Sequence, residues 1–113
     1  MENCIFCKII KGEIPSQTVY SDDECIVIRD IAPQAPVHLL MIPKDHYATV
    51  LELNEKRAEV LGRCMSKIGN IARQLGLDDG FRIIMNQGDD ACQTVKHLHI
   101  HILAGKKLSE KMV

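Results

Sequence analysis

Hydrophobic positions recur at helical spacing in two places along the chain. Near the N-terminus they run from Ile5 to Ile10 and stop at Gly12, which predicts one or two turns of helix. A longer pattern lies between Asn54, a good helix N-cap, and Gly76, which stands where a C-terminal cap is expected. Five residues of this second helix fall at intervals of three and four and should face the core: Leu61, Met65, Ile68, Ala72 and Leu75.

Runs of β-branched and other apolar residues predict strands on both sides of the long helix. They occupy residues 18–20, 25–28, 38–42, 81–86 and 97–103. The turn formers Ser21-Asp22-Asp23 join the first two runs into a hairpin, and Pro43 ends the third, whose density suggests burial on both faces. Residues 88–92 should form a loop. Strands before and after one helix predict an α+β fold with a mostly antiparallel five-stranded sheet.

Composition and charge fit one domain spanning residues 1–113. The chain has 113 residues, of which 46% are hydrophobic, enough for a single core. Its 14 basic and 15 acidic residues leave a formal charge of −1, so neither a nucleic acid nor a membrane is expected as a partner. Without an apolar run near the ~20 residues of a membrane span, or the features of a signal peptide, a cytoplasmic location is expected.

The five cysteines include one closely spaced pair, Cys4-x-x-Cys7. In a reducing compartment such a pair indicates metal binding rather than a disulfide framework. It has the spacing of half a tetrahedral zinc site, which needs two further ligands. Cys25 and Cys64 lie in apolar segments and are expected to be buried thiols.

Three histidines alternate along the last predicted strand, at His97, His99 and His101. Because side chains alternate across a strand, the three imidazoles should share one face, with apolar residues on the other. Two chemistries suit this arrangement. One is metal ligation, and the other is nucleophilic and acid–base work on an anionic substrate.

Several motifs together resemble the histidine triad family of nucleotide hydrolases and transferases. They extend over nearly the whole chain in the family's order: Cys4-Ile5-Phe6-Cys7-Lys8-Ile9-Ile10, Gly12-Glu13-Ile14-Pro15, the segment from Asp30 to His38, Ile42-Pro43-Lys44 and His97-Leu98-His99-Ile100-His101-Ile102-Leu103. The resemblance implies the histidine triad fold. It is strongest to the small bacterial and phosphoramidase-like members, which act as homodimers on purine nucleoside 5′-phosphoramidates and related adenylates.

The same resemblance implies a role for individual residues. His99 matches the nucleophile that becomes a nucleotidyl-histidine, and His101 matches the residue that contacts the phosphate and the leaving group. His38 matches a supporting histidine on a neighbouring strand, and His97 begins the triad. Asp30 matches the carboxylate that holds the ribose hydroxyls. Further positions match the nucleotide site: Phe6, Ile9, Ile31 and Leu40 around the base, Asn86, Gln93 and Thr94 near the phosphate and the leaving group, and Val95 as a further nucleotide-binding position.

The resemblance also completes the metal site. His46 and His97 match the two histidines that join Cys4 and Cys7 in the zinc-containing members. A closed set of four ligands leaves no open position, so this zinc is expected to be structural and to tie the N-terminal segment to the last strand. No organic cofactor is expected.

Two features keep other functions open. Cys92 stands where the family most often has glycine, and Gln93-Thr94-Val95-Lys96-His97 looks more like the dinucleoside polyphosphate hydrolases of the family. The alternatives to a phosphoramidase-like enzyme are therefore such a hydrolase and a nucleotide-binding module with little turnover. A metallohydrolase with His97, His99 and His101 as ligands is a third, although it lacks a nearby general base.

A homodimer is expected to use the long helix and the strand beside it. Gly62 and Gly69 are seven residues apart, away from the predicted core face, and would permit close approach of a second chain.

Overall fold

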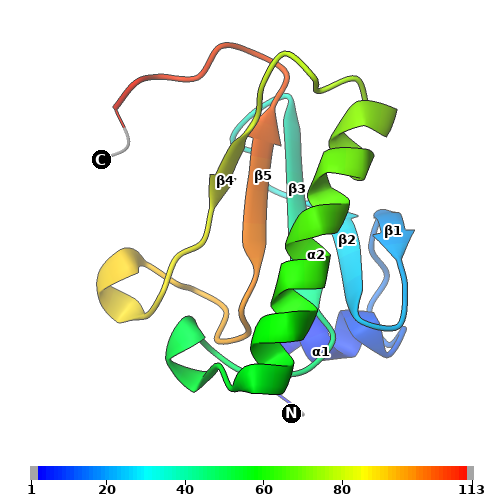
Figure 1. Ribbon diagram of the computed structural model, residues 1–113, viewed down its shortest axis with the longest axis vertical. Coiled ribbons are helices and arrows are strands. Elements are labelled where there is room, and N and C mark those ends of the chain that lie inside the picture. The colour runs from blue at the N-terminus through cyan, green and yellow to red at the C-terminus, as the bar shows by residue number, and fades with distance from the viewer. Residues whose placement is uncertain (1–2, 112–113) are drawn as a thin grey trace.

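The computed structural model describes residues 3–111 and contains one five-stranded sheet with two helices (Figure 1). Every neighbouring pair of strands is antiparallel, in the order β1-β2-β3-β5-β4. The α+β fold predicted from the sequence is confirmed. The elements in chain order are α1 (Ile5–Ile10), β1 (Thr18–Ser21), β2 (Cys25–Arg29), β3 (Val37–Pro43), the 3₁₀ turn η1 (Val50–Glu52), α2 (Glu55–Gln74), β4 (Arg82–Ile84), the 3₁₀ turn η2 (Asp89–Ala91) and β5 (Ile100–Ala104).

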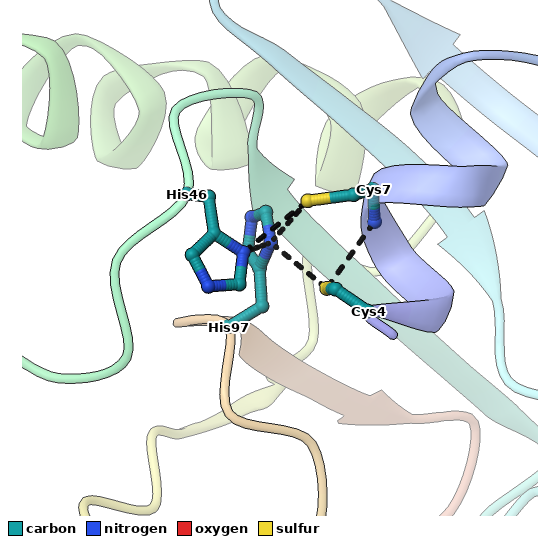
Figure 2. A group of neighbouring side chains, drawn as sticks. All are labelled: Cys4, Cys7, His46 and His97. Carbon is teal, nitrogen blue, oxygen red and sulfur yellow. Dashed lines mark hydrogen bonds between the residues drawn. The ribbon is translucent and has the colours of Figure 1, made fainter. Parts of the chain in front are cut away.

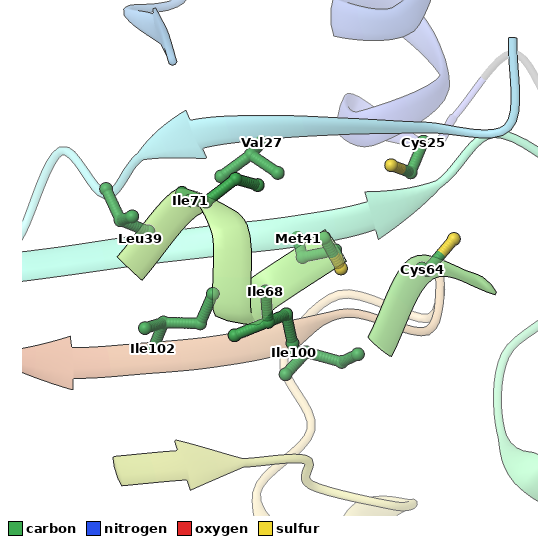
Figure 3. Close-up of a cluster of buried hydrophobic side chains, with 9 residues drawn as sticks. All are labelled: Cys25, Val27, Leu39, Met41, Cys64, Ile68, Ile71, Ile100 and Ile102. Carbon is green, nitrogen blue, oxygen red and sulfur yellow. The ribbon is translucent and has the colours of Figure 1, made fainter. Parts of the chain in front are cut away.

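The two faces of the sheet are covered by different helices because side chains alternate along each strand. Helix α2 covers one face, where its apolar residues meet alternate residues of the central strands (Figure 3). This cluster comprises Cys25, Val27, Leu39, Met41, Cys64, Ile68, Ile71, Ile100 and Ile102. The intervening residues of β2 and β3 pack with Phe6 of α1 in a second cluster: Ile26, Ile28, Leu40 and Ile42. Strand β3 is therefore buried on both faces, as predicted.

The ends of α2 follow the sequence signals. The side chain of Asn54 accepts a hydrogen bond from the Arg57 N–H at 2.8 Å, and Gly76 follows the last turn with a positive φ of 72°. Within the described residues 3–111, no helix is long and apolar enough to cross a membrane.

The predicted core face of α2 is wrong at one position. Met65 is 38% exposed, whereas Cys64 and Ile71 are buried. Because residues three and four positions apart lie on the same side of a helix, two adjacent rows of residues both satisfy this spacing. The row that contains Cys64 and Ile71 is the buried one. Cys25 and Cys64 are both buried, as expected of structural thiols.

The last two strands have other ends than the sequence pattern predicts. Strand β5 begins at Ile100, so residues 97–99 lie outside it. They leave the sheet because the Leu98 N–H donates to the Tyr47 carbonyl oxygen at 2.8 Å, which draws them toward the segment after β3. Strand β4 covers only Arg82–Ile84 of the predicted 81–86, and the predicted loop 88–92 contains the turn η2.

Candidate active site and metal cluster

Three imidazoles lie together on the sheet face that carries α1. His38 comes from β3 and His101 from the adjacent β5, and their ring centroids are 5.2 Å apart. His99 lies directly before β5, with its ring centroid 5.0 Å from that of His101. The order of the strands thus brings together histidines that are separated by about sixty residues of sequence.

The hydrogen bonds of His99 determine which of its nitrogens can act as a nucleophile. Its Nδ1 lies 2.8 Å from the main-chain oxygen of His97. A carbonyl oxygen only accepts, so Nδ1 carries the proton and donates it, leaving the lone pair of Nε2 free. The ring of Phe6 packs edge-on against this imidazole with centroids 5.0 Å apart. His99 is thus held in the tautomer that a nucleophilic role requires.

A chain of hydrogen bonds also sets the tautomers of His38 and His101. The Gln34 N–H donates to His38 Nδ1 at 3.0 Å, so the proton of a neutral His38 lies on Nε2. That Nε2 is 2.9 Å from His101 Nδ1 and donates to it. His101 consequently carries its proton on Nε2 and has a hydrogen-bond donor for a bound anion.

Burial keeps these two imidazoles neutral near pH 7. Desolvation lowers the pKa of His38, and the nearby Asp30 carboxylate opposes this shift. Desolvation also lowers the pKa of His101, and the neighbouring His99 and His38 lower it further. His101 is thus a neutral donor whose acidity rises whenever a positive charge develops beside it.

Asp30 lies at the edge of this group. One carboxylate oxygen accepts from the Ala32 N–H at 2.8 Å, and the other is 3.4 Å from His38 Nε2. Asp30 and Ile31 also line an open hollow of about 520 Å³. Ile31 is 97% exposed, so it offers an apolar surface at the rim of the hollow.

The other residues expected around the base lie deeper, as does Val95. Phe6 and Leu40 are buried members of the cluster under α1, and Ile9 and Val95 are half-buried against it. Most of their surface is used in packing α1 on the sheet. Among the residues expected to contact the base, Ile31 is therefore by far the most accessible.

His97 faces a different group of side chains. Its Nδ1 lies 3.5 Å from Cys4 Sγ, 3.6 Å from Cys7 Sγ and 3.1 Å from His46 Nδ1 (Figure 2). Cys7 Sγ is also 3.2 Å from His46 Nδ1. The N-terminal segment, the loop after β3 and the residues before β5 meet here, and together they form the cluster that the sequence predicts.

The donor atoms of this cluster fit a zinc ion. His97 Nε2 donates to the Pro43 carbonyl oxygen at 2.7 Å, so its Nδ1 points a lone pair at the other three side chains. Ordinary zinc bond lengths place two tetrahedral nitrogen ligands ~3.3 Å apart, and a nitrogen and a sulfur ~3.6 Å apart, close to the separations observed. Burial and the adjacent Cys4 raise the pKa of the Cys7 thiol, and burial lowers that of His97. A cation would be bound by all four side chains of this donor set.

The three triad histidines do not converge on a common point. His97 Nδ1 belongs to the cysteine cluster, while His99 Nδ1 is used by a backbone carbonyl. Asp30, His38 and His101 do lie close enough to suggest a second cation site. However, the Gln34 N–H places a proton on His38 Nε2, so that atom has no lone pair for a metal.

The loop before His97 contains the remaining predicted residues. Asn86 lies two residues beyond Ile84, which pairs with His101, and Thr94 is exposed at the surface of the loop. Gln93 is only 3% exposed. Lys96 forms an ion pair with Asp89 within the same loop, which the sequence pattern did not indicate.

Cys92 adopts the backbone conformation that a glycine would favour at its position. Its φ is 58° and its ψ is 39°, in the left-handed region. This conformation costs roughly 1–2 kcal/mol for a residue with a Cβ atom. Cysteine at this position therefore adopts a conformation that glycine would adopt at lower cost.

Known proteins are similar to this chain in sequence and in fold. The HIT domain matches residues 11–108. A 14 kDa zinc-binding protein of Brassica juncea is 45% identical over 107 residues, covering 93% of this chain and 95% of that protein. The adenylylsulfatase HINT1 of Arabidopsis thaliana is 43% identical over 107 residues, covering 93% and 73%. A HIT family hydrolase from Clostridium thermocellum superposes with a TM-score of 0.95 at 47% identity, covering 100% of this chain and 99% of that one.

Proposed function

Because this chain belongs to the HIT domain family, we propose that it hydrolyses purine nucleotides at the α-phosphate through a nucleotidyl-histidine intermediate. One observation carries this proposal. The free lone pair of His99 Nε2 lies beside the neutral His101, which carries its proton on Nε2, so a nucleophile and a hydrogen-bond donor share one face of the sheet. Asp30 and Ile31 lie at the edge of this face, where they would hold the ribose and the base.

In the first step, His99 Nε2 attacks the α-phosphorus, a P–N bond forms, and the bond to the leaving group breaks. His101 Nε2–H donates a hydrogen bond to the phosphate or to the departing atom. A leaving amine takes up this proton while His101 gains another from solvent, so the imidazole ends the step neutral. His99 becomes cationic as it bonds to phosphorus, and its Nδ1–H remains on the His97 carbonyl. In the second step, water attacks the same phosphorus, the P–N bond breaks, and the nucleoside monophosphate leaves.

The preferred substrates are nucleoside 5′-phosphoramidates and related adenylates. An Arabidopsis relative is named an adenylylsulfatase, which supports an adenylate with an anionic leaving group. Gln93-Thr94-Val95-Lys96-His97 favours dinucleoside polyphosphates as the second candidate. A binding module with little turnover would use the same nucleotide contacts without His99 as a nucleophile.

A panel of substrates tests this assignment. We expect kcat/KM to be at least about tenfold higher for adenosine 5′-phosphoramidate than for diadenosine polyphosphates, with AMP as a product of both. A higher kcat/KM for diadenosine polyphosphates would instead indicate a dinucleoside polyphosphate hydrolase. Binding of AMP without hydrolysis of any member of the panel would leave only the binding module.

Zinc in this proposal is structural, held by Cys4, Cys7, His46 and His97. Bound there, it supplies a rigid tie between the N-terminal segment and the residues that precede β5. The relative named a zinc-binding protein supports this assignment. The proposal needs no organic cofactor, and it places the enzyme in the cytoplasm.

The protein acts as a homodimer in this proposal. Among the described strands, β4 pairs only with β5, and Ile83 on it is 39% exposed. Apart from Gly62 itself, its chain neighbours and the adjoining backbone of α2, no atom of residues 3–111 lies within 4 Å of where a Cβ atom at Gly62 would be. We expect sedimentation at micromolar concentration to give twice the 12.7 kDa chain mass, and Ile83→Lys to shift the protein toward the monomer. Leu51→Lys, at a residue that is 91% exposed on η1, is the control. A monomer for the unaltered chain would contradict the dimer.

A further inference from the structure

Gln93 is buried in the loop that precedes the triad histidines, and every polar atom of its side chain is hydrogen-bonded to the main chain. Its Nε2 donates to the carbonyl oxygens of Ala48 at 2.7 Å and Val95 at 3.1 Å. Its Oε1 accepts from the Gly88 N–H at 2.8 Å. An amide nitrogen has two hydrogens, so both donors are already used. No donor of this side chain is left for a phosphate.

Gln93 also forms two hydrogen bonds with Gly88, which close the loop of residues 88–93. The Gln93 N–H donates to the Gly88 carbonyl oxygen at 3.1 Å, while the Gly88 N–H donates to the Gln93 side chain at 2.8 Å. Between these two residues lie the turn η2 and Cys92 with its left-handed backbone. The buried amide thus holds a bend that the local sequence disfavours.

Gln93 also joins this loop to the segment after β3. Its bond to Ala48 is accompanied by two further hydrogen bonds: Gln87 Oε1 accepts from the Val50 N–H at 2.7 Å, and the Leu98 N–H beyond the loop donates to the Tyr47 carbonyl oxygen. The segment after β3 also carries His46 of the metal cluster. The Gln93 side chain therefore connects the loop of residues 88–95 to the segment that supplies a metal ligand.

We propose that Gln93 is a positioning residue, which places Thr94 and the main chain around it against the α-phosphate, and that it does not bind the phosphate itself. This inference rests on the proposed function. A positioning residue acts on the geometry of the reacting groups, so its loss should lower kcat for every leaving group alike. Loss of a phosphate ligand would instead weaken the binding of AMP.

The test compares two variants of Gln93 in the full-length, zinc-loaded protein. Gln93→Met keeps the length of the side chain and removes all three hydrogen bonds, whereas Gln93→Glu keeps the acceptor for Gly88 and loses both donors. Thr94→Val, at an exposed residue expected to contact the phosphate, is the comparison. The measurements are kcat, KM, calorimetric affinity for AMP and amide hydrogen exchange.

We expect Gln93→Met to lower kcat about 10-fold to 100-fold for all substrates, to change AMP affinity less than about threefold, and to speed exchange in residues 44–54 and 86–96. Gln93→Glu should show the same pattern, which keeps the test valid if the first variant misfolds. Thr94→Val should weaken AMP without changing exchange. Unchanged exchange in both Gln93 variants, with AMP binding lost in proportion to kcat/KM, would overturn the proposal. If the unaltered chain hydrolyses no nucleotide, the proposed function fails, and exchange alone still decides whether Gln93 holds the two segments.

Discussion

Replacing His99 with Ala is expected to lower kcat by about a thousandfold or more, because the substitution removes the only atom assigned to attack phosphorus. Binding of AMP should persist, since Asp30 and the apolar residues around it are unchanged. His99→Asn should behave in the same way. Mass spectrometry of rapidly quenched enzyme, kept alkaline because a phosphoramidate is acid-labile, should find the nucleotidyl adduct on the peptide that carries His99.

Replacing His101 in the same way distinguishes the role of a proton donor from that of the nucleophile. His101→Ala should be mild for substrates with good leaving groups and severe for those that need a proton, such as amines. The covalent mechanism would be refuted by an active His99→Ala protein together with no adduct on the unaltered one. That result would favour hydrolysis by a metal-bound water.

The second large effect is expected at the metal cluster. Protein purified without added metal should contain close to one zinc per chain, and Cys4→Ser or Cys7→Ser should abolish its retention. Because structural zinc contributes folding free energy directly, we expect the free energy of unfolding to fall by about 3 kcal/mol or more. For a chain of this size, such a loss corresponds to a fall in Tm of roughly 10 °C. Elemental analysis and thermal unfolding provide the two measurements.

Two controls isolate the metal from other effects of these substitutions. Cys92→Ser changes an exposed thiol outside the cluster and should retain both zinc and stability. Cys4 Sγ also caps α1 by accepting from the Cys7 N–H, and serine is a favoured N-cap, so Cys4→Ser should not weaken the helix through its cap. Less than about a tenth of an equivalent of zinc, with an unchanged Tm in Cys4→Ser, would sink the zinc assignment.

The spacing of hydrophobic residues correctly predicted those helices and strands whose positions depend on packing alone. The hairpin, the buried β3 and the capped α2 follow directly from patterns of apolar and capping residues. The predicted core face of α2 was wrong at Met65 because two adjacent rows of residues along the helix both have intervals of three and four. The strand expected at 97–103 was too long because one hydrogen bond, from Leu98 to Tyr47, overrides local alternation.

The candidate site shows a similar division. The motif indicated which side chains gather, and the structure brings His38, His99 and His101 together and places His97 in the cysteine cluster. The tautomers depend on the main-chain groups of Gln34, His97 and Pro43, and a backbone N–H or C=O has no signature in the sequence. The burial of Gln93 also lay beyond the motif, because a buried glutamine and a phosphate ligand look alike in sequence.

The order of the strands in the sheet determines which parts of the protein can fold early. In the described part of the chain, strand β5 is the last of five strands, yet it is inserted between β3 and β4, and β4 has no other partner there. The hairpin of β1 and β2 can form early from local contacts, whereas the two strands on the far side of β3 must wait for β5. His99, the proposed nucleophile, and His97, a proposed zinc ligand, lie just ahead of that strand, so they reach their places in the same late step. During synthesis the nascent chain therefore assembles neither the proposed nucleophilic site nor the proposed metal cluster until its sheet is complete.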